Sequence, residues 1–94
     1  MKVDSLSRIL DGVTGVRKDG GAHLFPEDVD VSIFIGLPAE VLSLPRVARL
    51  TSTPDMVTIE TAKGERYYFA PEVIVGVKVG GAENKAHPRG PGFR

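Results

Sequence analysis

The chain has 94 residues, its 12 basic side chains are balanced by 12 acidic ones, and it contains no cysteine. This length predicts a single domain that can bury a core without cross-links. The missing cysteines exclude disulfides, zinc–thiolate sites and cysteine nucleophiles, and the formal net charge of zero argues against a dedicated nucleic-acid-binding protein. No signal peptide and no bilayer-spanning apolar run is recognisable, so we expect a cytoplasmic protein that does not bind membranes.

The first predicted element is a short helix over residues 4–11. Asp4 or Ser5 can cap its N-terminus, and Gly12 can end it. Its apolar residues share one face: Leu6, Ile9 and Leu10. A helix of this length is not stable alone, so we expect this face to pack on the rest of the domain.

A β-hairpin is predicted next, because the Asp-Gly pair within Lys18-Asp19-Gly20-Gly21 suits a tight turn. Residues 13–17 and 22–25 would form its two arms. Residues 29–35 are then predicted as a strand whose apolar residues alternate on one side: Val31, Ile33 and Ile35. Phe34 lies on the opposite side, which indicates that both faces of this strand are covered.

The segment after this strand, residues 37–45, is predicted to contain one helical turn and not a strand, because Pro38 and Pro45 bracket it. Its apolar residues crowd a connection that is normally polar: Leu37, Val41, Leu42 and Leu44. They form either a plug that closes one end of a barrel or a patch that binds a partner.

The second half of the chain predicts four strands separated by short turns. Their ranges are 47–52, 56–61, 65–70 and 73–79. The first three form an antiparallel meander, and the fourth follows a break at Pro71-Glu72.

The turn Ala62-Lys63-Gly64 sets the register of the hairpin that it closes. A three-residue turn with glycine in the left-handed conformation predicts these pairs: Glu60 with Arg66, Ile59 with Tyr67, and Val57 with Phe69. This register buries Tyr67 and Phe69 and leaves Tyr68 exposed. A platform for stacking nucleic-acid bases needs several exposed rings, so we favour a structural role for these aromatic residues.

His23 is the best candidate for metal or acid–base chemistry, because three carboxylates follow it closely in the sequence: Glu27, Asp28 and Asp30. An enzyme would need His23 together with Asp28 or Asp30. No second histidine lies nearby, and the chain has no nucleophile elbow and no phosphate loop. We therefore predict no catalytic residue, no metal and no cofactor, and we interpret the cluster as a solvated acidic loop.

Two resemblances concern the strands. Asp30-Val31-Ser32 followed by Gly36 resembles the Asp-x-Ser-x-x-Gly element of the PilZ family. The spacing differs by one residue and the family's upstream Arg-x-x-x-Arg is missing, so cyclic-dinucleotide binding is not carried over. The last hairpin, the break FAPE and the strand VIVGVKV resemble the end of SH3-like barrels in topology.

These patterns predict a mainly β fold of about six strands, with one short N-terminal helix. The strands would form a small antiparallel barrel or bent sheet, SH3-like or similar. Residues 1–80 would form the domain, and residues 81–94 a flexible, basic tail rich in glycine and proline.

The expected function is a non-catalytic protein–protein interaction module that forms a homodimer or binds another protein, as an adaptor or regulatory subunit. The expected interaction residues are apolar or aromatic: Leu37, Val41, Leu42, Leu44, Val73, Val75 and Tyr68. The alternative is a small β-barrel that binds nucleic acid or a nucleotide. It would use basic residues and one aromatic residue: Arg46, Arg49, Arg66, Tyr68, Lys85, Arg89 and Arg94.

Overall fold

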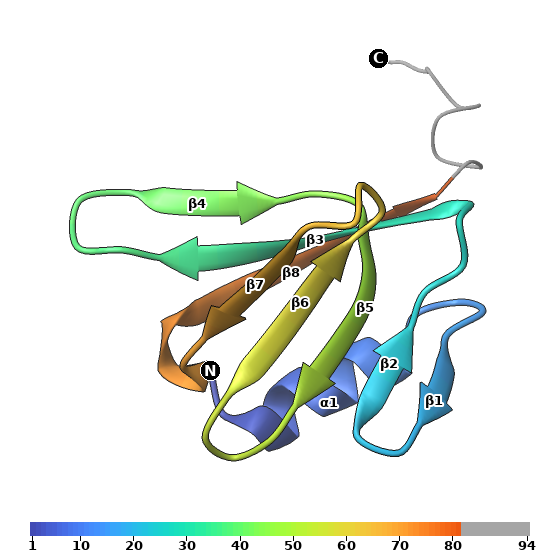
Figure 1. Ribbon diagram of the computed structural model, residues 1–94, viewed down its shortest axis with the longest axis horizontal. Helices are drawn as coiled ribbons and strands as arrows, with labels where there is room; N and C mark the ends of the chain where they lie inside the picture. Colours follow the sequence, from blue (N-terminus) through green and yellow to red (C-terminus); the bar gives the residue numbers. More distant parts are fainter. Residues whose placement is uncertain (82–94) are drawn as a thin grey trace.

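The computed structural model describes residues 1–81, which form one α-helix and eight strands in two antiparallel sheets (Figure 1). The strand order is β1-β2-β5-β6-β7 in the five-stranded sheet and β4-β3-β8 in the three-stranded sheet. The elements have these bounds: α1 (Val3–Asp11), β1 (Arg17–Asp19), β2 (Ala22–Leu24), β3 (Val29–Gly36), β4 (Val41–Leu44), β5 (Val47–Ser52), β6 (Val57–Thr61), β7 (Arg66–Phe69), the 3-10 turn η1 (Pro71–Val73) and β8 (Ile74–Gly81).

The predicted mainly β class with one short N-terminal helix is confirmed. Within residues 1–81 no strand pairing joins the two sheets, so they do not close into a barrel, and the SH3-like detail stays a prediction. The chain crosses from the five-stranded to the three-stranded sheet for the last time at η1, where Pro71 begins the turn and fixes its own φ angle. β8 then pairs with β3 and not with the meander of β5, β6 and β7. From residue 82 onward, the predicted tail lies outside the described residues.

Helix α1 supplies two leucines to the core, but it is not capped as predicted. Leu6 and Leu10 are fully buried, whereas Ile9 is exposed. The residue before the helix is Lys2, and no side chain caps the N-terminus, so the predicted cap at Asp4 or Ser5 is wrong. With nine residues of mixed polarity, α1 is too short to span a bilayer, and residues 1–81 contain no other α-helix.

The first hairpin forms, but its first arm and its turn differ from the prediction. The arm begins at Arg17, because Gly15 adopts a left-handed conformation (φ +79°) that interrupts the predicted strand over residues 13–17. Lys18 lies opposite His23 within the strand ladder, so the turn is the pair Gly20-Gly21 and not four residues.

One hydrophobic core joins α1 and both sheets. The apolar side of β3 is fully buried as predicted, and Phe34 on its other side is half-buried. The buried core residues come from every layer: Leu6, Leu10, Val13, Phe25, Val31, Ile33, Ile35, Leu44, Val47, Leu50, Val57, Ile59 and Ile74. Tyr67 and Phe69 are half-buried and pack against this core, with their ring planes stacked.

The predicted register of the β6–β7 hairpin is confirmed. Glu60 lies opposite Arg66, Ile59 opposite Tyr67, and Val57 opposite Phe69. Gly64 closes the turn with φ +88°, the left-handed conformation that glycine adopts at no steric cost.

The predicted helical turn between Pro38 and Pro45 is wrong, because residues 41–44 form strand β4 and pair with β3. Both prolines stand outside this short strand, so neither removes a hydrogen bond from its ladder. Pro38 lies in the two-residue turn between Leu37 and Glu40, whose backbones exchange hydrogen bonds. The prolines were expected to break any regular strand in residues 37–45, but a four-residue strand fits between them.

Candidate functional site

The β3–β4 hairpin extends beyond the other elements at its loop end (Figure 1). We call residues 33–44 the projecting hairpin. Ile35 lies opposite Leu42, and Gly36 lies opposite Val41. Because side chains alternate along a strand, Leu42 belongs to the face of the buried Ile35, whereas Val41 belongs to the opposite, outer face.

Apolar side chains are exposed on both faces of the projecting hairpin near its end, and Glu40 is its one charged residue. On the outer face, 62% of Val41 is accessible to solvent. On the inner face, 36% of Leu42 and 38% of Leu37 are accessible, because the hairpin extends past the core that buries Ile35. Apolar side chains exposed on both sides of one hairpin are typical of a surface that binds a protein.

The outer face continues from the hairpin onto β8. Val75 is 55% exposed and lies directly against Gly36, where an added Cβ would stand only 2.8 Å from Val75 Cγ1. Gly36 therefore makes room for Val75 beside Val41. Further along the sheet Phe34 lies between Ser43 and Gly76, which are too small to cover its ring. The outer face at this end is thus flat, apolar and uncharged.

The free edge of β4 offers unpaired backbone groups. Leu37 and Glu40 exchange two hydrogen bonds, with N···O distances of 2.8 and 3.4 Å. Hydrogen-bonded and non-hydrogen-bonded pairs alternate in an antiparallel ladder, so the next hydrogen-bonded residue of β4 is Leu42. The N–H and C=O groups of Val41 and Ser43 therefore point away from β3, where no strand of residues 1–81 lies.

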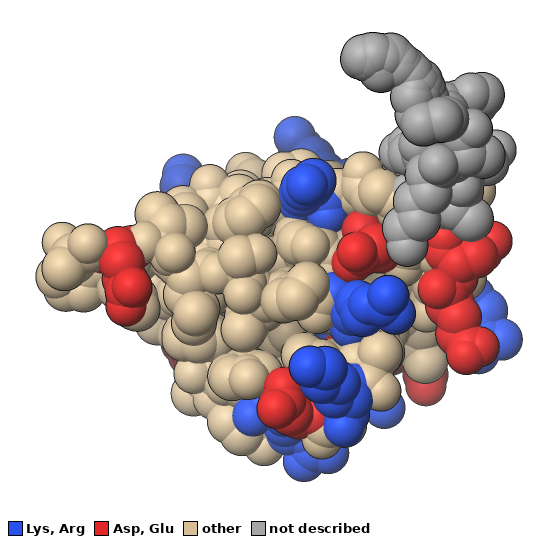
Figure 2. Space-filling model, turned by 90° about the horizontal axis from the view of Figure 1, so that it is seen from above, with Lys and Arg blue, Asp and Glu red and all other residues tan. Residues whose placement is uncertain are grey.

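β4 differs from the other edge strands in its charge. Four strands have one side without a strand partner in the described part of the chain: β1, β4, β7 and β8. β1 carries three charged residues, while β7 carries Arg66 and β8 carries Lys78. β4 carries none. The view from above shows a broad uncharged surface between an acidic residue near the tip of the projecting hairpin and the charged residues, most of which gather at the other end (Figure 2). Charged side chains protect an edge from pairing with another chain, so β4 is the least protected edge.

The predicted interaction residues do not form one surface. Leu44 is buried in the core, and because the two sheets of residues 1–81 do not close into a barrel, it does not plug a barrel end. Val73 is half-buried and packs against the same core. Tyr68 is exposed but belongs to the five-stranded sheet. The residues that the structure brings together are those near the end of the three-stranded sheet: Leu37, Val41, Leu42 and Val75.

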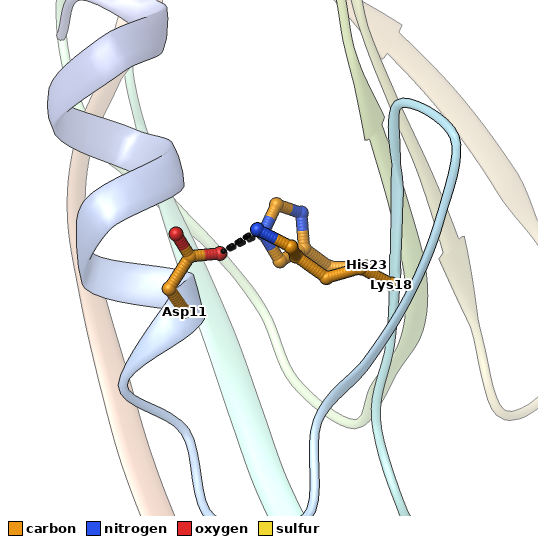
Figure 3. Close-up of polar contacts among 3 residues, drawn as sticks. All are labelled: Asp11, Lys18 and His23. Carbon is orange, nitrogen blue, oxygen red and sulfur yellow. Dashed lines mark hydrogen bonds and ion pairs between the residues drawn. The ribbon is translucent and has the colours of Figure 1, made fainter.

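His23 is placed with Asp11 and not with the carboxylates that follow it in the sequence. Its Nε2 lies 2.8 Å from Asp11 Oδ1 at the end of α1, and Lys18 Nζ lies 3.3 Å from the same oxygen (Figure 3). The hydrogen bond from His23, followed by the interaction with Lys18, lowers the pKa of Asp11. This triad joins the helix to the first hairpin. The sequence could not reveal it, because Asp11 and His23 belong to different elements.

The buried His23 offers no recognisable chemistry. Its Nδ1 is buried and has no hydrogen-bond partner. In residues 1–81 no group of three or more acidic or histidine side chains could hold a metal ion. His23 is thus buried between α1 and the first hairpin, with Asp11 as its bonded partner.

Arg46 lies apart from the other predicted basic residues. It adopts φ +54°, and its N–H donates to Asp30 Oδ1 at 3.0 Å, while its C=O accepts from the Ala62 N–H at 2.8 Å. These two bonds hold Arg46 in a conformation that few residues other than glycine adopt. A cavity of about 350 Å³ lies beside it, and Glu27, Asp28 and Asp30 contribute to its lining.

The other two predicted arginines meet on the outer face of the five-stranded sheet. Arg49 and Arg66 flank Glu60, with N···O distances of 4.0 and 3.6 Å. The side chain of Tyr68, followed by the charge of Glu60, raises the pKa of Arg66. Tyr68 lies on this same face, where 58% of it is exposed. The strand register also adds Arg17 to the row, a residue that the sequence argument missed. Lys85, Arg89 and Arg94 lie outside the described residues.

Comparison of the chain with protein-family models, curated proteins and solved structures found no match.

Proposed function

We propose that this protein is a non-catalytic protein–protein interaction module that self-associates, and that it acts as a cytoplasmic adaptor or regulatory subunit. The observation that carries the proposal is the projecting hairpin, which exposes apolar side chains on both faces and has the uncharged strand β4 at its free edge. Leu37, Val41 and Leu42 stay exposed in the folded chain, although the transfer of an apolar side chain out of water is favourable in free energy. A protein surface that covers them would supply this stabilisation.

The role of an interaction module also fits the polar groups of the chain. On the face seen in Figure 2, most charged residues lie away from the projecting hairpin. The cluster of Asp11, Lys18 and His23 is satisfied within the fold, apart from one ring nitrogen. We therefore assign the function to the surface on which exposed apolar residues cluster: Leu37, Val41, Leu42 and Val75.

The test is the solution mass of the full chain, measured by light scattering behind size exclusion over a concentration series. We expect a dimer that dissociates on dilution. Val41→Glu should shift the chain to a monomer, because it places two carboxylates at the contact. Met56→Glu is the matched control, since Met56 is similarly exposed in the turn between β5 and β6, away from the hairpin (Figure 1). A monomer at every concentration, or an equal effect of both variants, would contradict self-association through the hairpin.

The second candidate function is nucleic-acid binding on the outer face of the five-stranded sheet. It rests on the row of Arg17, Arg49 and Arg66 beside the exposed ring of Tyr68, in which Glu60 is the one acidic member. Titration of labelled single-stranded DNA and RNA at low salt tests it. Binding that weakens steeply with added salt and is lost in Arg66→Ala would favour this candidate. No binding at low salt would remove it.

A further inference from the structure

We propose that two copies of this chain join by pairing their β4 strands antiparallel about a two-fold axis at Leu42, which produces one continuous six-stranded sheet. The strand order across the pair would be β8-β3-β4-β4-β3-β8. This inference rests on the proposed self-association and specifies the strand, the register and the symmetry of the contact.

A comparison of the charges on the four edge strands favours a second copy of the chain as the partner that pairs with β4. When a strand pairs antiparallel with its own copy, a charged residue at the two-fold axis faces an identical charge. An axis at Lys18 in β1, at Arg66 in β7 or at Lys78 in β8 would therefore be repulsive. β4 has no charged residue, so it can pair with itself without repulsion. Glu40, just outside the strand, would face Leu44 of the second copy and not another carboxylate.

The outward backbone groups of β4 determine the register. An axis at Leu42 places Val41 opposite Ser43 of the second copy, and Ser43 opposite its Val41. Both residues direct N–H and C=O away from β3, so each of these two pairs can exchange two hydrogen bonds. An axis at Ser43 would instead place Val41 opposite Pro45, which has no N–H to donate. An axis at Val41 would place Ser43 opposite Ala39, which lies in the turn.

This register also covers the exposed side chain of Leu42. Leu42 would face its own copy in a non-hydrogen-bonded pair, where the Cα atoms stand about 4.5 Å apart and side chains meet closely. The two Leu42 side chains would form an apolar contact at the axis, flanked on each side by Ile35. Such a short edge buries less than the roughly 1,200 Å² of a standard interface, so we expect a dimer that depends on concentration.

The first experiment uses a disulfide as a measure of distance. The chain contains no cysteine, so Leu42→Cys introduces a single thiol. In the proposed register the two thiols stand across the axis at a separation that suits a disulfide. We expect mild oxidation to convert most of the full-length chain to a cross-linked dimer. Met56→Cys is the matched control and should cross-link only slowly, because Met56 is as exposed but lies away from the hairpin.

The second experiment removes one outward N–H from each copy. Ser43→Pro deletes a donor that β3 does not use, so the hairpin should keep its internal ladder, which circular dichroism can verify. The dimer would lose two hydrogen bonds, which weakens association roughly 30-fold. Ser43→Ala keeps the N–H and should associate like the parent chain, as measured by light scattering.

The outcomes separate this inference from the proposed function. Cross-linking through Leu42→Cys, together with weak association of Ser43→Pro alone, supports the pairing. A dimer that neither cross-links at Leu42 nor responds to Ser43→Pro overturns the pairing but leaves self-association standing. A parent chain that stays monomeric at every concentration overturns both.

Discussion

Gly64→Ala isolates the energetic consequence of one backbone angle. Gly64 has φ +88°, and no atom lies within 4 Å of the position that a Cβ would take. The variant therefore creates no clash with a neighbouring element, and its effect comes from the left-handed conformation alone. That conformation costs an alanine about 1–2 kcal/mol. Alanine also lowers the conformational entropy of the unfolded chain, which stabilises the folded state by about 0.4–1 kcal/mol. We therefore expect the free energy of unfolding to fall by about 1 kcal/mol.

Gly80→Ala is the matched control, because it makes the same chemical change in equally open space. Gly80 lies in β8 without a left-handed φ, so alanine there should raise the free energy of unfolding by about 0.5 kcal/mol. The two variants should then differ by about 1.5 kcal/mol, or by about 6–12 °C in Tm for a domain of this size. Thermal unfolding followed by circular dichroism, at a concentration where the chain is monomeric, measures this difference. If Gly64→Ala were as stable as Gly80→Ala, the three-residue turn and the register argued from it would be refuted.

Three further predictions concern the triad, the core and Arg46. The pKa of Asp11 is lowered chiefly by its hydrogen bond from His23, so Asp11 stabilises the fold above its usual pKa of 3.8 and loses this effect as pH falls through the folded value. Urea unfolding should therefore show Asp11→Asn to be less stable than the parent chain at about pH 7, with the difference narrowing as pH falls below 3.8. Ile33→Ala should lower the free energy of unfolding by about 2–5 kcal/mol, because Ile33 is fully buried, whereas Val41→Ala in the monomer should change it by less than about 0.5 kcal/mol. Thermal unfolding should show that Arg46→Val loses more than about 1 kcal/mol while Arg46→Gly loses none, since a β-branched residue is poorly accommodated at φ +54°. Equal stability of these last two variants would contradict the assigned strain.

The parts of the fold that follow from local pattern were predictable. The β6–β7 register came from one glycine turn and the alternation of Val57 and Ile59, because a shift by one residue would expose the apolar side. The buried face of β3 followed from the same alternation. In each case the physical cause of the structure lies in residues that are close together in the sequence.

The parts that depend on distant partners were not predictable. β4 is a strand because β3 pairs with it, and the sequence of β4 alone, between two prolines, suggested a helical turn. Helix α1 ends where Asp11 meets His23, and that contact needs the helix to dock beside the hairpin. The exposed residues Leu37, Val41 and Leu42 were recognised from their apolar character. Their separation from the buried Leu44 required knowledge of where the core ends.

The pairing of β3 with β8 also has a consequence for the order of folding. The two strands lie far apart in the chain, with the whole meander of β5, β6 and β7 between them. Contacts between such distant segments form late, because a long loop must close first. During synthesis, the β3–β4 hairpin would emerge before β8, so the edge of β3 that pairs with β8 would stay open until β8 is made. The nascent chain is therefore most prone to aggregation in this interval, and variants that slow the docking of β8 should lower the soluble yield more than their equilibrium stability suggests.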